Sequence, residues 1–431
     1  MSLKQKTISG TKWTSINKIV ITVFAIVKLS ILTRYLDKGD FGLMAIVNLV
    51  LGFMNMFVSL GLNTAIIHKQ NISKNEYSSL YLMNVFMSVL IMILVIISSP
   101  FIANFYTEPR LTDLIIIMSL TIIISAIGNQ YQTIKQKELE FKFISIVSIV
   151  AAIISLVFSI YLAINGYGVY SLVYSSLVGV IFSNIVYFSD GILKKGFTFH
   201  FRLKEIKPFF KIGIYQVGGQ IINFLNRDID TLLIGKLLGA EVLGGYSLAK
   251  QLVLRPTSII NPIFTTVASP ALAKIQNDKK QLNLAYLKLL NIISSLNFVA
   301  YFMLCIFAYP VVIILYGSDF IGIVTIVQIL CFYMYVRSLG NPVGCLVVAT
   351  GKTHLEFYWN LLSLFILPTF VYLGSLHNLT TICIALCLYS VVSIYPAFRI
   401  MVKPIIKIDF QLYMKTIIKL NFIRFTKLLK S

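Results

Sequence analysis

Apolar segments long enough to cross a bilayer follow one another along this chain, and they constrain its fold more than any other feature. An α-helix needs about 20 consecutive apolar residues to span the hydrocarbon core of a membrane. Twelve such segments occur, near residues 11–35, 41–66, 79–106, 111–133, 142–163, 168–189, 209–238, 242–267, 283–309, 321–349, 355–376 and 379–401. Only 12% of the 431 residues are charged, whereas about a quarter is usual in soluble proteins. The sequence predicts an all-α polytopic membrane protein with about twelve transmembrane helices.

The net charge of +21 is typical of nucleic-acid-binding proteins, but the positions of the basic residues indicate a different origin. If the N-terminus is cytoplasmic, 26 Lys and Arg residues lie in inside segments and four outside. Such a bias predicts orientation, because basic residues collect in cytoplasmic loops. We therefore expect both termini to be cytoplasmic and no nucleic-acid partner.

The predicted helices fall into two sets of six. The expected organisation is an N-terminal six-helix lobe, a cytoplasmic interlobe linker, a C-terminal six-helix lobe and a basic amphipathic cytoplasmic tail, at residues 1–189, 190–208, 209–403 and 404–431. The tail interleaves Lys and Arg with Ile, Phe and Leu, a pattern that favours contact with the inner surface of a membrane.

A weak internal repeat supports the two lobes. A shift of 202 residues places LDKGDFGLMAIV, from Leu36, on LGAEVLGGYSLA, from Leu238, with Gly42 on Gly244. Six helices return the chain to its starting side, so the halves are predicted to be parallel repeats. Transporters with this organisation carry their substrate site between the repeats, in a central cavity.

One predicted span carries a polar stripe. Its members recur every three or four residues and so share one face of a helix: Gln216, Gln220, Asn223, Arg227 and Asp230. Because a charge at the bilayer centre costs at least about 2.5–3.5 kcal/mol on insertion scales, this face should meet a wet cavity or polar partners. The alternative is a structural pairing of Arg227 with Asp230, or with Asp228, that only joins helices.

Basic residues outnumber acidic ones inside the predicted spans. The basic ones are Lys18, Lys28, Arg227, Lys250, Arg255, Lys288 and Arg337. Lys288 lies near a helix end, where its side chain can reach the interface. The other six, with Gln220 and Asn223, are the candidate residues for binding an anionic substrate. Asp228 and Asp230 are candidates for coupling transport to a Na+ or H+ gradient; their alternative role is to neutralise Arg227 and Lys28.

No catalytic pattern emerges from the sequence. Gly351-Lys352-Thr353 resembles the end of a phosphate-binding loop, but Leu346 occupies the position of the required earlier glycine. The four histidines make no metal-ligand or Ser/His/Asp spacing. We therefore expect a transporter rather than an enzyme, with no catalytic residues, no metal site and no cofactor.

The sequence resembles polysaccharide exporters of the multidrug/oligosaccharidyl-lipid/polysaccharide flippase superfamily, specifically the Wzx-type, colanic-acid-exporter-like branch. The resemblance is most specific between Gln220 and Asp278, in NFLNRDIDTLLIGKLLGAEVLGGYSLAKQL and the later PALAKIQND, and LDKGDFGLMAIV also fits. It implies a two-lobed bundle in the bacterial cytoplasmic membrane that moves an undecaprenyl-diphosphate-linked oligosaccharide by alternating access. It also implies a hydrated basic cavity and polymerase or glycosyltransferase partners. Many relatives have helices thirteen and fourteen, and we expect residues 404–431 not to supply them, because they are too highly charged.

Other functions remain open at this point. A multidrug or organic-cation antiporter of the same superfamily should have mainly acidic residues in its cavity. A membrane-embedded glycan polymerase or ligase would need large outside loops, but the predicted outside loops are short. A scaffold that transports nothing would have no use for repeated polar stripes.

Overall fold

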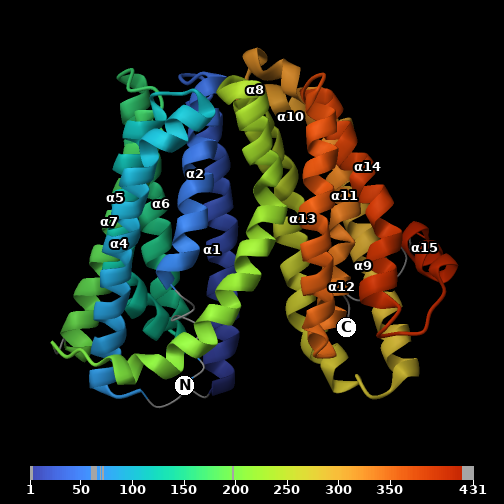
Figure 1. The fold of residues 1–431 in the computed structure, drawn as a ribbon, viewed down its shortest axis with the longest axis horizontal. Helices are drawn as coiled ribbons and strands as arrows, with labels where there is room; N and C mark the ends of the chain where they lie inside the picture. Colours follow the sequence, from blue (N-terminus) through green and yellow to red (C-terminus); the bar gives the residue numbers. More distant parts are fainter. Residues whose placement is uncertain (1–2, 60–65, 68, 70–71, 197–198, 420–431) are drawn as a thin grey trace. The chain divides into compact units, whose positions relative to one another are not determined.

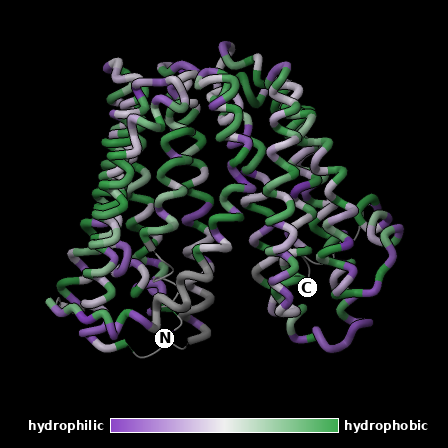
Figure 2. The backbone as a smooth tube through the Cα atoms, viewed as in Figure 1, coloured by the Kyte–Doolittle hydropathy of each residue, from purple (hydrophilic) through white to green (hydrophobic). Residues whose placement is uncertain are grey.

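The computed structural model describes residues 3–59, 66–67, 69, 72–196 and 199–419. Regular structure in these residues is helical throughout (Figure 1). Eleven candidate membrane spans meet the length and hydropathy expected of a transmembrane helix. Hydrophilic residues gather at helix ends and connections (Figure 2). The prediction of an all-α polytopic membrane protein is confirmed.

The difference between eleven spans and the predicted twelve comes from one helix. α8 (Leu203–Lys274) contains both predicted segments, 209–238 and 242–267. It is interrupted at Gly239, whose φ of 84° is a backbone conformation that glycine adopts without steric cost. Contacts between residues on the two sides of Gly239 show that the chain turns back there. α8 therefore supplies two of the twelve predicted spans.

The chain forms two compact units. Unit 1 comprises Met1–Phe224, Gly239–Gly244 and Leu315–Gly317, and unit 2 comprises Leu225–Leu238, Gly245–Ile314 and Ser318–Ser431. The lobe and linker boundaries drawn from the sequence stay a prediction.

Unit 1 contains six long helices and the start of α8. They are α1 (Leu3–Leu32), α2 (Lys38–Ser59), α4 (Lys74–Tyr106), α5 (Leu111–Lys137), α6 (Phe141–Ile164) and α7 (Tyr170–Lys195). α5 packs against α2, α4 and α7, and α6 packs against α1 and α7.

Unit 2 contains the rest of α8 and the later helices. They are α9 (Lys279–Ile306), α10 (Ala308–Tyr316, whose last residues belong to unit 1), the 3₁₀ helix η1 (Ser318–Ile323), α11 (Val324–Ser338), α12 (Gly340–Ala349), α13 (Thr353–Ser375), α14 (Leu379–Ala397), the π-helix η2 (Phe398–Val402) and α15 (Phe410–Ile418). α11 packs against α9 and α14, and α13 packs against α14.

The same helix pairs pack together inside each unit. In unit 1 the pairs are α4 with α5, α5 with α7, and α6 with α7; their counterparts in unit 2 are α9 with α11, α11 with α14, and α13 with α14. This agreement supports the internal repeat independently of the sequence identity. Each half of the chain builds the same kind of helix bundle.

The two copies of the glycine-containing repeat segment meet within unit 1. A Cβ atom at Gly42 would overlap the backbone carbonyl of Ala240, and one at Gly244 would overlap that of Lys38. The two contacts are reciprocal, because both pairs are related by the 202-residue shift. Glycine is needed at both positions, since only a residue without Cβ lets the backbones come this close.

Hydrogen bonds join α4 to the connection between α7 and α8 and to the first turn of α8. The Ser79 hydroxyl donates to Glu205 Oε2 at 2.7 Å and accepts from the backbone amide of Arg202 at 3.1 Å. His200 Nε2 lies 3.0 Å from Glu205 Oε1. These two partners, Ser79 first, hold the pKa of the Glu205 carboxyl below its usual value.

Part of the predicted amphipathic tail is a docked helix. α15 buries the side chains of Tyr413 and Ile417. Two side chains of α9 bond the C-terminal end of α15: Asn291 donates to the Thr416 carbonyl at 2.8 Å, and Ser294 donates to the Ile417 carbonyl at 2.9 Å. Residues 420–431 of the predicted tail lie outside the described residues. Membrane contact by the tail stays a prediction.

Candidate functional site

The carboxylate of Asp230 is the centre of a polar cluster inside unit 2. Its side chain is 3% exposed. Oδ1 accepts from the Thr231 amide at 2.7 Å, and Oδ2 accepts from the Tyr246 hydroxyl. Tyr246 reaches Asp230 because the chain turns back at Gly239 between them. A buried carboxylate needs such donors, since burial without partners is costly.

Lys250 supplies the positive charge for this cluster. Its ammonium donates to Asp230 Oδ1 at 2.8 Å, to Thr231 Oγ1 at 2.9 Å, to the Arg227 carbonyl at 3.1 Å and to Asp228 Oδ1 at 3.3 Å. Lys250 is 12% exposed. Four oxygen atoms therefore surround one ammonium group. Its single positive charge offsets the negative charge of Asp230, while Asp228 also bonds Arg227.

The pairing within the stripe differs from the alternative expected from helical spacing. Arg227 Nε bonds Asp228 Oδ2 at 2.8 Å, whereas Asp230 pairs with Lys250. Arg227, Gln220 and Asn223 are exposed while Asp230 is buried, and the side chain of Gln216 lies outside the described part. Of the two structural pairings expected for Arg227, the one with Asp228 is present and the one with Asp230 is not, because Asp230 points into the bundle, where α8 folds back on itself.

Arg337 lies beside this cluster on α11. Its guanidinium bonds the Tyr333 hydroxyl at 3.3 Å and lies 5.8 Å from the centre of the Tyr333 ring. Among the described residues Arg337 forms no ion pair with a carboxylate, Asp230 included. Arg337 also lines a cavity of about 190 Å³ within unit 2.

Lys28 is the corresponding basic residue of unit 1. Its ammonium donates to Ser155 Oγ at 3.0 Å and to Ser175 Oγ at 2.8 Å, which come from α6 and α7. Within the described residues, no carboxylate forms an ion pair with Lys28. The expected alternative, in which Asp228 and Asp230 neutralise Arg227 and Lys28, is observed for Arg227, which bonds Asp228. For Lys28 it stays a prediction, because Lys28 and these carboxylates belong to different units.

The remaining candidates have fewer contacts. Lys18 is exposed and Arg255 is half-buried, and neither side chain has a hydrogen bond or ion pair within the described part of the chain. The predicted shared site for Lys28, Arg227, Arg255 and Arg337 requires residues from both units, and it stays a prediction.

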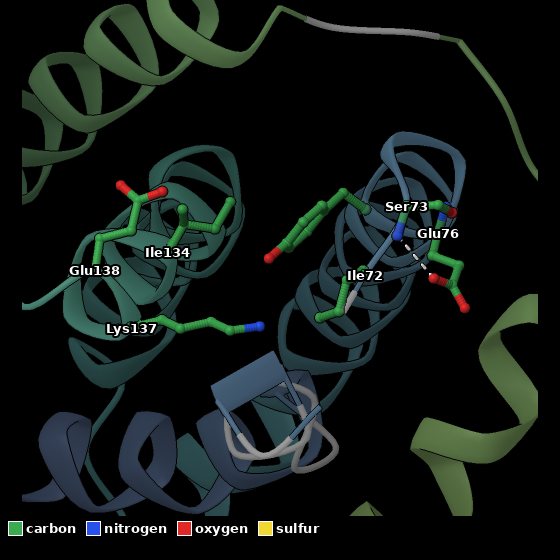
Figure 3. A pocket seen from close by; sticks show the side chains of 7 residues that line it. Ile72, Ser73, Glu76, Ile134, Lys137 and Glu138 are labelled. Atoms are coloured by element: carbon green, nitrogen blue, oxygen red, sulfur yellow. Dashed lines mark hydrogen bonds between the residues drawn. The ribbon is translucent and has the colours of Figure 1, made fainter. Parts of the chain in front are cut away.

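A larger cavity lies elsewhere, between α4 and α5 in unit 1. It measures about 690 Å³ and is lined by Glu76, Tyr77, Lys137 and Glu138 among others (Figure 3). Ser73 begins α4, and its backbone amide donates to Glu76 at 2.8 Å. Lys137 donates to the backbone carbonyl of residue 69 at 2.5 Å. No predicted site residue lines this cavity, which lies where the sequence predicts the cytoplasmic end of the helices.

Several partners of the site could not be identified from sequence patterns. Tyr246 and Thr231 complete the Asp230 cluster, and Ser155 and Ser175 hold Lys28. The repeat offered one indirect signal, because the 202-residue shift places Lys28 on Asp230 and so indicates that both positions carry polar chemistry.

Comparison with known proteins supports the sequence resemblance. A family model described as "Polysaccharide biosynthesis protein" matches residues 31–325. The chain is 31% identical to "Lipopolysaccharide biosynthesis protein WzxC" of Escherichia coli (strain K12), over 94% of this chain and 83% of that protein. It is 30% identical to "Teichuronic acid biosynthesis protein TuaB" of Bacillus subtilis (strain 168), over 83% and 74%.

Solved structures agree on the fold. "Lipid II flippase MurJ, inward closed conformation" has a TM-score of 0.78 at 14% identity, covering 98% of this chain and 93% of that one. An inward-facing "multidrug resistance MATE family transporter of the MOP superfamily" has a TM-score of 0.68 at 14% identity, covering 88% and 94%. Since the family model matches more than half of the sequence, this chain belongs to the polysaccharide biosynthesis protein family.

Proposed function

We propose that this protein moves a lipid-linked oligosaccharide across the cytoplasmic membrane by alternating access. The substrate would be a repeat unit of an exopolysaccharide, capsule or O-antigen on an undecaprenyl-diphosphate carrier. Two relatives are named for lipopolysaccharide and teichuronic acid biosynthesis, and a protein named as a lipid II flippase shares the fold. These names support a glycan substrate and a transport role rather than an enzymatic one.

The observation that carries this proposal is the ammonium of Lys28, which is held inside a predicted span by hydroxyl groups alone among the described residues. A positive charge at membrane depth is expensive unless a negative charge compensates it. Attraction between charges is several times stronger there than in water. A carrier diphosphate would supply the missing negative charge.

We propose that Arg227 and Arg255 contribute to the same anion site. Arginine suits this role because its planar guanidinium group can bind two phosphate oxygens at once and always carries its positive charge. Arg227→Ala and Arg255→Ala should reach normal abundance but lose glycan export, with the lipid-linked precursor trapped on the cytoplasmic face. Wild-type export in both variants at normal abundance would refute the proposed site.

We also propose that Asp228 and Asp230 carry coupling to a Na+ or H+ gradient. Both are carboxylates inside a predicted span, and in this structure both form an ion pair with the ammonium of Lys250. A neutralised Asp230 could release Lys250, which would link protonation to rearrangement of α8. Asp230→Asn should export glycan independently of the ion gradient. Unchanged gradient dependence in both Asn variants would contradict this step.

A multidrug antiporter is the second candidate, because the fold of a multidrug transporter is similar. Organic cations would favour free carboxylates, yet Asp228 and Asp230 are both paired with basic side chains. Deletion of the protein separates the candidates: glycan loss with unchanged drug sensitivity supports the flippase, and the reverse supports the antiporter. We further propose that a polymerase or glycosyltransferases act beside it.

A further inference from the structure

The cavity beside Arg337 has features that the proposed anion site does not explain. It lies within unit 2, is partly open, and measures about 190 Å³; parts of α8, α11, α12, α13, α14, η2 and α15 line it. A water molecule takes up about 30 Å³ in the liquid. The cavity is therefore larger than a single inorganic phosphate requires and is on the scale of one sugar ring.

Arg337 gives this cavity a positive charge with unused hydrogen-bonding capacity. A guanidinium group has five N–H donors, and the bond to the Tyr333 hydroxyl accounts for one of them. No carboxylate lies within ion-pair distance of Arg337 among the described residues. The nearby carboxylate of Asp230 is already bonded to Lys250 and Tyr246. Arg337 is therefore suited to a bidentate contact with an oxyanion that enters the cavity.

The rest of the lining suits the other parts of a sugar. The side-chain oxygen Oδ1 of Asn226 is buried and has no partner within the described residues, while its Nδ2 donates to the Asn360 carbonyl at 2.6 Å. An unpartnered buried oxygen is costly, so a sugar hydroxyl that reached it would gain a favourable hydrogen bond. Trp359 and Tyr389 also line the cavity. The apolar C–H faces of a pyranose ring pack well on the faces of these aromatic side chains, each of which also has one polar N–H or O–H group.

We propose that the Arg337 cavity binds one sugar ring that carries a carboxylate, as a subsite for an acidic sugar of the transported glycan. Arg337 binds the carboxylate, Asn226 accepts from a ring hydroxyl, and Trp359 covers one face of the ring. The inference rests on the proposed function for the origin of its ligand. It goes beyond that function by placing one sugar, rather than the carrier diphosphate, inside unit 2.

Trp359 makes this proposal directly measurable. The chain has two tryptophans, Trp13 and Trp359, so Trp13→Phe leaves Trp359 as the single indole reporter. The purified full-length Trp13→Phe protein in nanodiscs is titrated with sodium D-glucuronate, D-glucose or inorganic pyrophosphate. We expect glucuronate to change Trp359 fluorescence saturably, and we expect glucose to bind at least tenfold more weakly.

Matched variants in the same background identify the anion contact. Arg337→Gln should weaken glucuronate binding by about tenfold or more, because a hydrogen bond to a charged group contributes about 1.5–3 kcal/mol. Lys288→Gln removes the same charge at an exposed position and should bind like its parent. Ser393→Asp places a carboxylate in the lining of the same cavity and should also prevent glucuronate binding, which provides a second test if Arg337→Gln folds poorly.

Three results would overturn the proposal: equal binding of glucose and glucuronate, a response to pyrophosphate but not to glucuronate, or no response to any of the three. The assay does not require transport. If glucuronate fails to bind while deletion of the protein still traps lipid-linked precursor, the subsite is refuted and the flippase function stands. If glucuronate binds but deletion leaves glycan export intact, the proposed function fails instead.

Discussion

Removing the ammonium of Lys250 tests whether the cluster around Asp230 stabilises unit 2. In Lys250→Met the carboxylate of Asp230, 3% exposed, keeps the Thr231 amide and the Tyr246 hydroxyl but loses its positive partner. Breaking a buried ion pair by removing one partner costs about 3–5 kcal/mol, because the other charge stays buried. We expect Lys250→Met to lower the free energy of unfolding by this amount.

The reverse substitution should cost less. In Asp230→Asn the ammonium of Lys250 still bonds Asp228 Oδ1, at 3.3 Å, and the Thr231 hydroxyl, at 2.9 Å. The expected loss is about 1.5–3 kcal/mol, the range for a hydrogen bond to a charged group. The double variant removes both charges, so its loss should fall short of the sum of the single losses by about 2 kcal/mol or more.

Unfolding in mixed detergent and SDS micelles measures these differences on the purified protein. Lys288→Met is the control, because Lys288 is exposed and its substitution should change stability by no more than about 0.5 kcal/mol. The reasoning is refuted if Lys250→Met is as stable as Lys288→Met. It is also refuted if the losses of Lys250→Met and Asp230→Asn simply add in the double variant.

Three further predictions follow from other parts of the molecule. Gly42→Ala should destabilise unit 1 by about 1–3 kcal/mol, whereas Gly39→Ala, where a Cβ meets nothing within 4 Å, should be tolerated in the same SDS unfolding assay. The pKa of Glu205 is lower in the folded state than in the unfolded state, so ionised Glu205 stabilises the folded state, and this stabilisation is lost as the pH falls through the lower, folded value. A spin label at residue 204 should therefore become more mobile in strong acid, and equal mobility at pH 7 and at a pH well below 4.5 would contradict this. A cysteine replacing Lys195 should resist an impermeant thiol reagent on intact cells, and labelling from outside would refute the predicted topology.

The helical part of the fold was largely predictable, because hydropathy acts over whole segments. Most predicted spans coincide with a helix or part of one, although the span predicted at 321–349 is divided among η1, α11 and α12. The turn at Gly239 follows from a glycine between two apolar segments. The sequence repeat placed Gly42 and Gly244 at equivalent positions, but it did not predict that the two segments are in contact. Close approach of two backbones depends on how helices cross, which periodicity along one helix does not specify.

The site was less predictable, because its partners are distant in sequence. Helical spacing offered Arg227 and Asp230 only as an alternative pair one turn apart, and the partner of Asp230 is Lys250, twenty residues further on. That pairing depends on the register in which the two parts of α8 pack after the turn. Serine is common in membrane helices, so nothing marked Ser155 or Ser175 as partners of Lys28.

The pairing of charges strengthens the case for an anionic substrate beyond what a count of residues could do. A neutral scaffold would be expected to match its buried cations with carboxylates of its own. Here Asp230 and Asp228 are already bonded to Lys250 and Arg227. Within the described residues, Arg337 bonds the hydroxyl of Tyr333, and Lys28 bonds the hydroxyls of Ser155 and Ser175. Both basic side chains are thus placed in predicted spans with neutral partners, an expensive arrangement that a negatively charged ligand would relieve during transport.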